Sequence, residues 1–249
     1  MVCVAFVAGA CVTRTPLESA TSTIVVHGVL NGVQDDQIVA VQRTTQGVPA
    51  ASPVDSATVT ITGPDGIAMT GVEGQDSSLT RVYRVTLSKF HEQLTPGGTY
   101  RLHVRLKTGE EVTGTTTIPN AQPVLSPIAI LPFNEMTDTI KLSWPAVPGA
   151  SSYEVRVQST AGVYALFADT SVVLPGTMRS FNGTAVFANG LNHTVVVSAV
   201  DANYYQYYRT TSDPFSGATV QGNLWGAEGV FGSLVIVAVR AFHVATTVH

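Results

Sequence analysis

The amino-acid sequence predicts an all-β protein made of two β-sandwich domains in tandem, followed by a C-terminal β extension. Its 249 residues suffice for two domains of ordinary size. Short segments that alternate apolar and polar residues recur between turns rich in Gly and Pro, as is typical of half-buried strands. Val, Thr, Ser and Gly are abundant, Leu, Glu and Lys are scarce, and no segment has a convincing amphipathic helical pattern.

The clearest strands lie in the middle of the chain. Residues 139–144 place their apolar side chains, with Trp144 among them, on one face of an extended segment. A turn with two prolines and a glycine follows, and residues 153–157 then resume the alternation. We therefore expect two adjacent antiparallel strands, with Trp144 as a packing centre of the core.

The same stretch carries a family resemblance. The sequence LSWPAVPGASSYEVRV of residues 142–157 resembles the second and third strands of a fibronectin type III domain, and residues 187–201 resemble its sixth strand and the preceding turn. The resemblance covers residues 120–215 and implies a spacer or binding module, not an enzyme. His193 stands where that family has a corner tyrosine, so the tether is either made by the imidazole or absent.

Residues 21–119 are expected to form the first sandwich, with about seven strands. The clearest strands are expected at residues 23–30, 38–44, 57–62, 81–87, 99–106 and 112–118. Residues 47–56 contain two prolines and are expected to form a loop. The sequences ATVTI, followed by a PDG turn, and LTPGGTYRLHV resemble the immunoglobulin-like and transthyretin-like domains of bacterial envelope proteins.

Two further segments complete the division of the chain. Residues 119–127 contain three prolines and are the expected domain boundary. Residues 216–249 form the expected C-terminal extension, packed on the second domain or between the two. Its apolar run is shorter than the roughly 20 residues of a membrane helix, so we expect a buried strand.

The N-terminus is expected to be an export signal and tether, over residues 1–20. The sequence AGAC of residues 8–11 resembles the lipobox of bacterial lipoproteins, which implies that Cys11 is lipidated and anchors the chain to a membrane. A buried first strand or a disordered remnant is the alternative.

The chain also has an export cysteine, the sequence IVVHG at residues 24–28, two β-domains, a tyrosine-rich segment and the sequence GVFG at residues 229–232. Together these features resemble a family of Bacteroidetes-type outer-membrane lipoproteins that are often encoded beside TonB-dependent receptors. The resemblance implies a bacterial cell-envelope location and an envelope partner such as that receptor.

The densest candidate site is a run of four tyrosines and an arginine near residue 205. If this run is a strand, alternate tyrosines face opposite sides. An exposed pair beside the arginine, with a tryptophan nearby, would suit stacking on the rings of a glycan or anchoring a protein partner. The alternative is that these rings fill the seam between the second domain and the tail. The candidate residues are Tyr204, Tyr205, Tyr207, Tyr208, Arg209 and Trp225.

Composition and motifs point away from other classes of function. Charged residues make up 12% of the chain, the net charge is -4, and Lys and Arg form no cluster, so no nucleic-acid partner is expected. Neither the histidines nor Cys3 and Cys11 have the spacing of metal ligands, so we expect no metal and no cofactor. No nucleophile elbow or phosphate loop is present, so we expect no catalytic residues.

The predicted function is a non-catalytic envelope lipoprotein that binds a ligand or partner. The alternatives are a structural or adhesive spacer protein and, less favoured, an enzyme built from loop carboxylates.

Overall fold

The computed structural model describes residues 22–45, 48–75, 81–86, 94–127, 129–211 and 220–245. Within these ranges the predicted all-β class is confirmed, with strands throughout and one short helix. The elements are β1 (Ile24–Asn31), β2 (Asp36–Thr45), β3 (Val48–Pro53), β4 (Thr58–Thr62), β5 (Ala68–Thr70), β6 (Val72–Gln75), β7 (Arg81–Thr86), β8 (Thr99–Arg105), β9 (Glu111–Thr117), β10 (Ile130–Phe133), β11 (Thr139–Ser143), β12 (Ser152–Ser159), β13 (Gly162–Ala168), β14 (Ser171–Pro175), β15 (Asn192–Val200), α1 (Ala202–Thr211) and β16 (Glu228–Val244). The predicted export segment and Cys11 lie outside the described residues.

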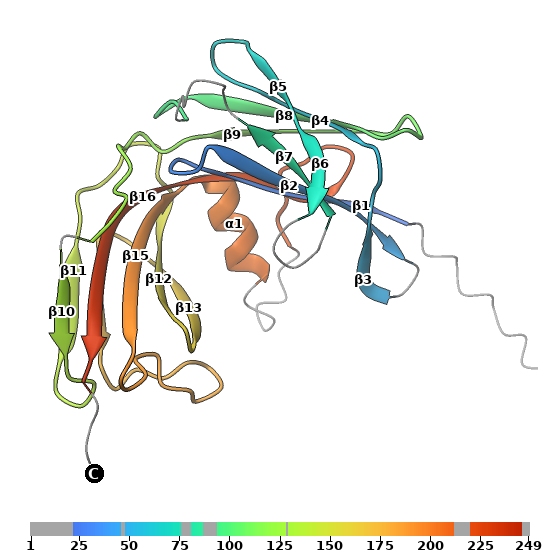
Figure 1. The fold of residues 1–249 in the computed structure, drawn as a ribbon. Helices are drawn as coiled ribbons and strands as arrows, with labels where there is room; N and C mark the ends of the chain where they lie inside the picture. Colours follow the sequence, from blue (N-terminus) through green and yellow to red (C-terminus); the bar gives the residue numbers. More distant parts are fainter. Residues whose placement is uncertain are drawn as a thin grey trace, which may run out of the picture.

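The strands form three sheets. The largest has ten strands in the order β13-β12-β15-β16-β1-β2-β7-β6, with β10 added beside β16 and β3 beside β2. A four-stranded sheet has the order β5-β4-β8-β9, and β11 and β14 form a two-stranded sheet. Figure 1 shows that the large sheet bends: β1, β2 and β7 run across the upper half, whereas β10, β12, β13 and β15 extend downward, and α1 lies inside the bend.

One long strand, β16, belongs to both halves of the bent sheet. It begins in a parallel ladder with β1, from Val25 opposite Glu228 to Asn31 opposite Leu234. From Leu234 onward it pairs antiparallel with β15, and its last residues pair in parallel with β10. The predicted C-terminal strand is thus present, and both halves depend on it for backbone hydrogen bonds.

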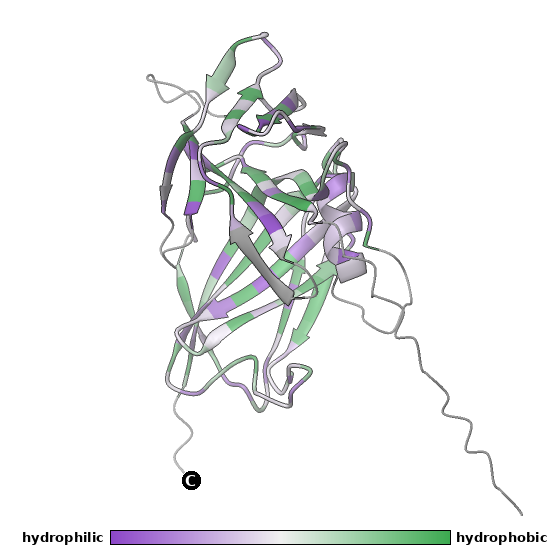
Figure 2. Cartoon of the chain, turned by 90° about the vertical axis from the view of Figure 1, so that its right-hand side faces the viewer, coloured by the Kyte–Doolittle hydropathy of each residue, from purple (hydrophilic) through white to green (hydrophobic). Residues whose placement is uncertain are grey.

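Each half has its own hydrophobic core, which lies between part of the large sheet and a smaller sheet. The first core is built by β1, β2, β7 and the start of β16 against the four-stranded sheet, and includes Val26, Val39, Ile61, Leu102 and Phe231. The second is built by β12, β15 and the end of β16 against β11 and β14, and includes Trp144, Val155, Leu174, Phe187 and Val197. Figure 2 shows hydrophobic and hydrophilic residues alternating along many strands, as expected when one face is buried.

The pairing predicted for the central stretch is wrong, although both strands exist. Strand β11 pairs with β14, whereas β12 pairs with β13 and β15 in the large sheet. The link between them crosses from one sheet to the other, since Pro145 and Pro148 lack the amide hydrogen a ladder needs and Gly149 has φ 82°. Trp144 is confirmed as a core residue: it is 7% exposed, and its ring centroid lies 5.4 Å from that of Tyr153.

The corner before β15 is tied by an imidazole. His193 is 1% exposed, and its Nε2 accepts a hydrogen bond of 3.1 Å from the backbone N–H of Ala188. Its Nδ1 lies 3.3 Å from the carbonyl oxygen of Leu191. Of the two alternatives that the sequence left open, the histidine tether is therefore the one present.

Residues 48–53 form a strand, so the loop predicted over 47–56 is wrong in its first part. Strand β3 pairs with β2 alone. Its outer edge carries no ladder among the described residues, and prolines are tolerated at such an edge.

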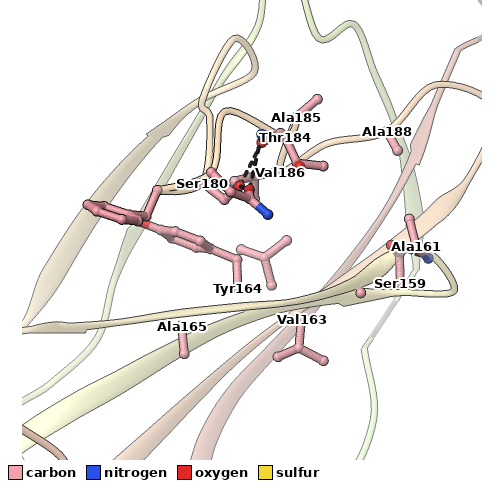
Figure 3. A pocket seen from close by; sticks show the side chains of 14 residues that line it. Ser159, Ala161, Val163, Tyr164, Ala165, Ser180, Thr184, Ala185, Val186 and Ala188 are labelled. Carbon is pink, nitrogen blue, oxygen red and sulfur yellow. Dashed lines mark hydrogen bonds between the residues drawn. The ribbon is translucent and has the colours of Figure 1, made fainter. Parts of the chain in front are cut away.

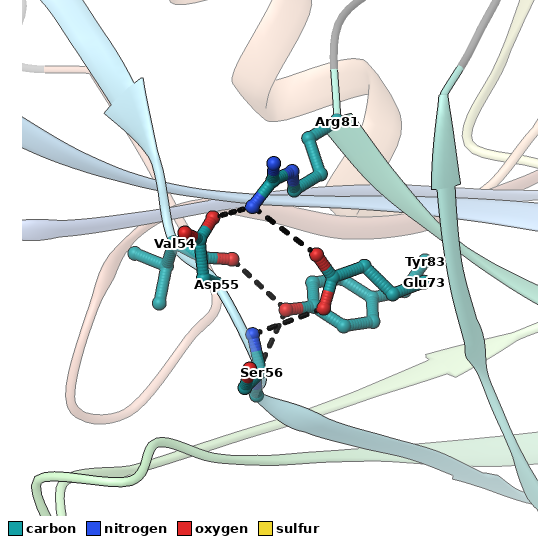
Figure 4. A network of polar contacts seen from close by, with 7 residues as sticks. Val54, Asp55, Ser56, Glu73, Arg81 and Tyr83 are labelled. Carbon is teal, nitrogen blue, oxygen red and sulfur yellow. Dashed lines mark hydrogen bonds and ion pairs between the residues drawn. The ribbon is translucent and has the colours of Figure 1, made fainter.

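A polar network holds the segment after β3 against β6 and β7 (Figure 4). Arg81 is paired with Asp55, and its Nη1 also lies 3.3 Å from Glu73. Glu73 accepts a hydrogen bond of 3.0 Å from the backbone N–H of Ser56, which has φ 59°. Below this pair, the Tyr83 hydroxyl donates to the carbonyl of Val54 at 2.9 Å. Because Asp55 and Glu73 both pair with Arg81, these contacts fix the segment after β3 to β6 and β7 and account for the three charged side chains structurally.

Gly229 provides a test of how tightly β16 joins β1. Its φ is 109°, and a Cβ there would overlap the carbonyl oxygen of Val26 in the neighbouring strand. We predict that Gly229→Ala lowers the free energy of unfolding by at least about 3 kcal/mol in urea denaturation. Gly66→Ala is the matched control, because Gly66 has φ 81° but open space around it, and should cost about 1 kcal/mol. Equal losses in the two variants would contradict the close approach of the strands.

Candidate binding surface

The four tyrosines of the candidate site lie on helix α1 and not on the strand that was considered for them. The helix begins directly after Asp201, whose carboxylate Oδ1 accepts a hydrogen bond of 2.9 Å from the backbone N–H of Tyr204. The Asp201 carbonyl accepts a second one, of 3.1 Å, from the N–H of Tyr205. An aspartate in this N-cap position accepts hydrogen bonds from backbone N–H groups of the first turn, which have no acceptor within the helix. This local stabilisation outweighs the preference of tyrosine for strands.

Asp201 also joins the helix to two sheets. Its carboxylate accepts hydrogen bonds from the Thr116 hydroxyl on β9 at 2.6 Å and from the Ser233 N–H on β16 at 3.1 Å. The side chain is buried, and burial raises the pKa of this carboxyl although the hydrogen bonds act in the opposite direction. The start of α1 is therefore fixed to β9 and β16 by one buried group.

Tyr204 and Tyr208 share a helix face, as residues four apart do. Tyr204 is 3% exposed, and its ring centroid lies 4.3 Å from that of Tyr208. Its hydroxyl donates to the Glu154 carboxylate at 3.0 Å, and Arg156 donates to the same carboxylate at 2.8 Å. Gly232 on β16 allows this approach, because a Cβ there would lie only 3.0 Å from the Tyr204 nitrogen. Tyr204 thus fastens α1 to β12 and β16.

Tyr207 and Tyr208 surround His27 of β1. The Tyr208 hydroxyl lies 2.6 Å from His27 Nε2, and the Tyr207 ring meets the imidazole edge-on at 6.0 Å between centroids. Burial lowers the pKa of His27 and raises the pKa of Tyr208 to about 12, so both groups are neutral at pH 7. This contact connects the helix to the upper half of the sheet.

Tyr205 is half-buried, whereas Arg209 is exposed. The Tyr205 ring contacts Phe167 of β13 at 5.1 Å between centroids, and the Arg209 guanidinium lies 5.7 Å from its centre. Arg209 also donates to Gln206 at 2.8 Å and is exposed. We call Val200, Tyr204 and Leu234, together with the residues packed on them, the corner cluster; Tyr205 and Tyr208 belong to it. This arrangement agrees with the alternative in which the tyrosines fill a seam.

Removal of the Asp201 carboxylate should destabilise the whole chain. We predict that Asp201→Ala lowers the free energy of unfolding by about 2 to 4 kcal/mol, since it removes the helix cap and leaves buried donors on Thr116 and Ser233 without an acceptor. Asp65→Ala, in an exposed turn, should change it by about 0.5 kcal/mol or less. Urea denaturation measures both values, and a loss below 1 kcal/mol for Asp201→Ala would contradict the assigned role.

His27 should make stability depend on pH. Its lowered folded-state pKa means that the unfolded chain takes up a proton more readily, so stability is complete above the ordinary pKa of 6.5 and falls as the pH drops below it. Between pH 7.5 and 5.5 we expect His27 to contribute a loss of up to about 1 kcal/mol. His193 has the same direction of shift and remains in both proteins, so the difference between wild type and His27→Gln isolates His27. Identical pH slopes in urea unfolding would contradict this role.

Trp225 lies apart from the tyrosines, against the four-stranded sheet. Its backbone exchanges two hydrogen bonds with Thr113 of β9, at 2.9 and 3.1 Å, while its side chain is 71% exposed. No ring contact between Trp225 and α1 occurs within the part of the chain that the structure describes. The prediction therefore joined two separate places: the corner cluster, whose rings are largely packed, and an exposed indole on another surface.

The strand registers define what surrounds this indole. Thr60 lies opposite His103, His103 opposite Thr113, and Thr113 opposite Trp225, so the four side chains form one row on the outer face. Arg101 lies in the next row, between Thr62 and Thr115. All of these residues except Thr60 line a shallow hollow of about 590 Å³ beside Trp225. We call this surface, made of Thr62, Arg101, His103, Thr113, Thr115 and Trp225, the Trp225 platform.

The Trp225 platform combines an aromatic face with groups that form hydrogen bonds. Arg101 and His103 are exposed, and His103 Nε2 lies 3.6 Å from the Glu111 carboxylate. Three threonines, Thr62, Thr113 and Thr115, line the same hollow. Arg101 and His103 were not among the predicted site residues, although their positions in segment 99–106 place them on the exposed face of a strand. Their proximity to Trp225 could not be predicted, because it depends on the register between β8, β9 and residue 225.

The described residues show neither a membrane helix nor a cluster suited to a metal. No helix in the described ranges is long and apolar enough to cross a bilayer. Across the same ranges, no three His, Cys, Asp or Glu side chains lie close enough together to hold an ion.

The fold and the site define an all-β protein with a bent shared sheet, a helix in its corner and an exposed tryptophan beside a polar hollow. The chain belongs to the family described as "Domain of unknown function (DUF4249)", whose model matches residues 13–240.

Two solved structures show a distant likeness to the chain. The first is described as fibronectin domains FN1–FN3 of chicken CNTN1; it is 12% identical with TM-score 0.22, and the match covers 89% of this chain and 67% of the other. The second is described as a Ca²⁺-stabilised adhesin with which an Antarctic bacterium binds ice; it is 16% identical with TM-score 0.21, and the match covers 92% of this chain and 50% of the other.

Proposed function

We propose that this chain is a non-catalytic protein of the bacterial cell envelope that binds a ligand or a partner protein through the Trp225 platform. The observation that carries the proposal is the exposure of Trp225, which is 71% accessible although its backbone is fixed to Thr113 by two hydrogen bonds. A large rigid aromatic side chain left in water gains much when a partner covers it, at little cost in conformational entropy.

The chemistry of the surface favours a glycan as the ligand. The apolar face of a sugar ring can stack on the indole, while its hydroxyls need donors and acceptors around the rim. Arg101, His103 and the threonine hydroxyls of the hollow supply both. A protein partner with an exposed polar loop would use the same groups.

The envelope location and the receptor partner rest on the sequence. The export-type N-terminus and the lipobox-like sequence before Cys11 support a lipid anchor on the outer membrane. A TonB-dependent receptor for nutrient uptake is the partner that the family resemblance suggests. In that arrangement the platform would hold a nutrient, or the receptor itself.

A structural or adhesive spacer is the second candidate function. It is supported by the corner cluster, in which Tyr204 and Tyr208 pack α1 against both halves of the bent sheet. Such packing suits a module that keeps a fixed angle between its ends.

A binding assay with Trp225→Ala separates these functions. We predict that the wild-type protein binds members of a panel of immobilised neutral oligosaccharides and that Trp225→Ala weakens this binding about tenfold or more, as expected for a central aromatic anchor. Met136→Ala is the control, because Met136 is a large apolar residue that is 64% exposed elsewhere on the chain.

Protein partners are tested in parallel with a photo-crosslinking residue placed at position 225. Binding that survives Trp225→Ala would contradict the platform. So would a complete absence of oligosaccharide binding together with an absence of cross-links to envelope proteins in the native cells.

A further inference from the structure

Strand β13 forms one margin of the ten-stranded sheet, next to β12 (Figure 1). It pairs with β12 over its whole length, from Tyr153 opposite Ala168 to Ser159 opposite Gly162. No described segment pairs with its other side. Its sequence, GVYALFA, contains no charged residue and no proline. A strand of this kind offers unpaired N–H and C=O groups to any further strand.

The other edge strands in the described ranges are protected against such pairing. Strands β3, β10 and β14 contain prolines, and charged residues lie on β6 and β11. Strand β5 has only three residues, and the outer side of β9 is occupied by Trp225. Short edges, charges, prolines and covering segments are the means by which proteins prevent sheets from joining. Among the described strands, β13 alone has none of them.

An apolar hollow adjoins the same strand. It measures about 630 Å³ and lies between the β12–β13 hairpin and the loop 180–188, and none of its lining residues is charged. Figure 3 shows the Tyr164 side chain pointing toward this loop and Val163 pointing to the other side of the strand. Val163 is 66% exposed. Phe181 is 100% exposed, on a turn closed by a hydrogen bond of 2.8 Å from Ser180 N–H to the Thr184 carbonyl.

We propose that β13 is a dimerisation edge, at which β13 of a second copy of this chain adds antiparallel to extend the sheet. The occupant must be extended, uncharged and free on one side. β3, β10 and β14 are also uncharged and free on one side, but each contains a proline that lacks an N–H for a ladder, and β5 has only three residues. Among the described strands, β13 is therefore the one longer than three residues that meets all three conditions with an uninterrupted set of N–H donors. Antiparallel pairing of a strand with its own copy is compatible with a two-fold axis, so the contact closes after two subunits. Because the strand is uncharged, the two copies do not repel each other there.

The expected dimer is weak. The strand contributes seven residues, whereas a standard stable interface, which buries roughly 800 Å² per partner, uses about 20 to 30 residues on each side. Its population should therefore depend on protein concentration. Coverage of Val163 and Phe181 would remove from water two large apolar side chains that the single chain leaves exposed.

Sedimentation analysis of the full chain over a wide concentration series tests the proposal. The wild-type protein should show a monomer–dimer equilibrium. Val163→Lys places lysines on both copies at the shared edge and should weaken dimerisation about tenfold or more. Val72→Lys is the matched control, since Val72 is 72% exposed on β6 at the opposite margin of the sheet, and should leave the equilibrium unchanged. Far-UV circular dichroism confirms that each variant is folded.

Three results would overturn the proposal. The wild-type protein could remain monomeric at the highest concentration, which would show that the edge recruits no second copy. Val163→Lys could dimerise as well as the wild type, which would place the dimer interface elsewhere. Val72→Lys could weaken the dimer as much as Val163→Lys, which would show that the added net charge, and not its position on β13, weakens dimerisation.

Discussion

The hydrogen-bond ladder along β16 is the interaction on which the rest of the structure depends. This strand provides the partner of β1 in one half and of β15 in the other, so neither half of the large sheet is complete without it. Its side chains enter both cores, with Phe231 and Val235 in the first and Phe242 and Val244 in the second. The two sandwiches are therefore joined by a strand that belongs to both, and not only by a linker. The bend between them lies where β16 passes from one sandwich to the other.

Helix α1 stabilises this bend from the inside. Asp201 caps the helix and at the same time binds β9 and β16, Tyr204 reaches Glu154 on β12, and Tyr208 reaches His27 on β1. The tyrosines thus act mainly in packing. The surfaces left for binding lie elsewhere: the Trp225 platform on the four-stranded sheet, and the edge of β13. Both are held on regular strands, which gives them a fixed geometry.

Local patterns predicted most strands but not how distant strands meet. Alternation of apolar and polar residues identified β2, β4 and β7, because burial of one face leaves this pattern in neighbouring residues. A continuous apolar run identified β1, and the resemblance to a fibronectin type III domain identified β15. The alternating pattern could not show that β11 and β12 belong to different sheets. Their pairing partners, β14 for β11 and β15 for β12, lie farther along the chain. The helix was missed since four tyrosines favour a strand, although Asp201 was a recognisable N-cap. Of the Trp225 platform, the sequence identified Trp225 alone. Arg101 and His103 could be assigned to it only from the register between β8, β9 and residue 225.

Whether the two halves unfold together tests the shared strand most directly. The chain has two tryptophans, Trp144 in the second core and the exposed Trp225 beside the first. In Trp225→Phe, fluorescence reports the second core alone, while far-UV circular dichroism reports the strands of both halves. One urea transition that coincides for the two signals is expected if β16 makes a single cooperative unit. Two separated transitions, with Trp144 following only one of them, would show that the halves fold independently and would contradict this arrangement.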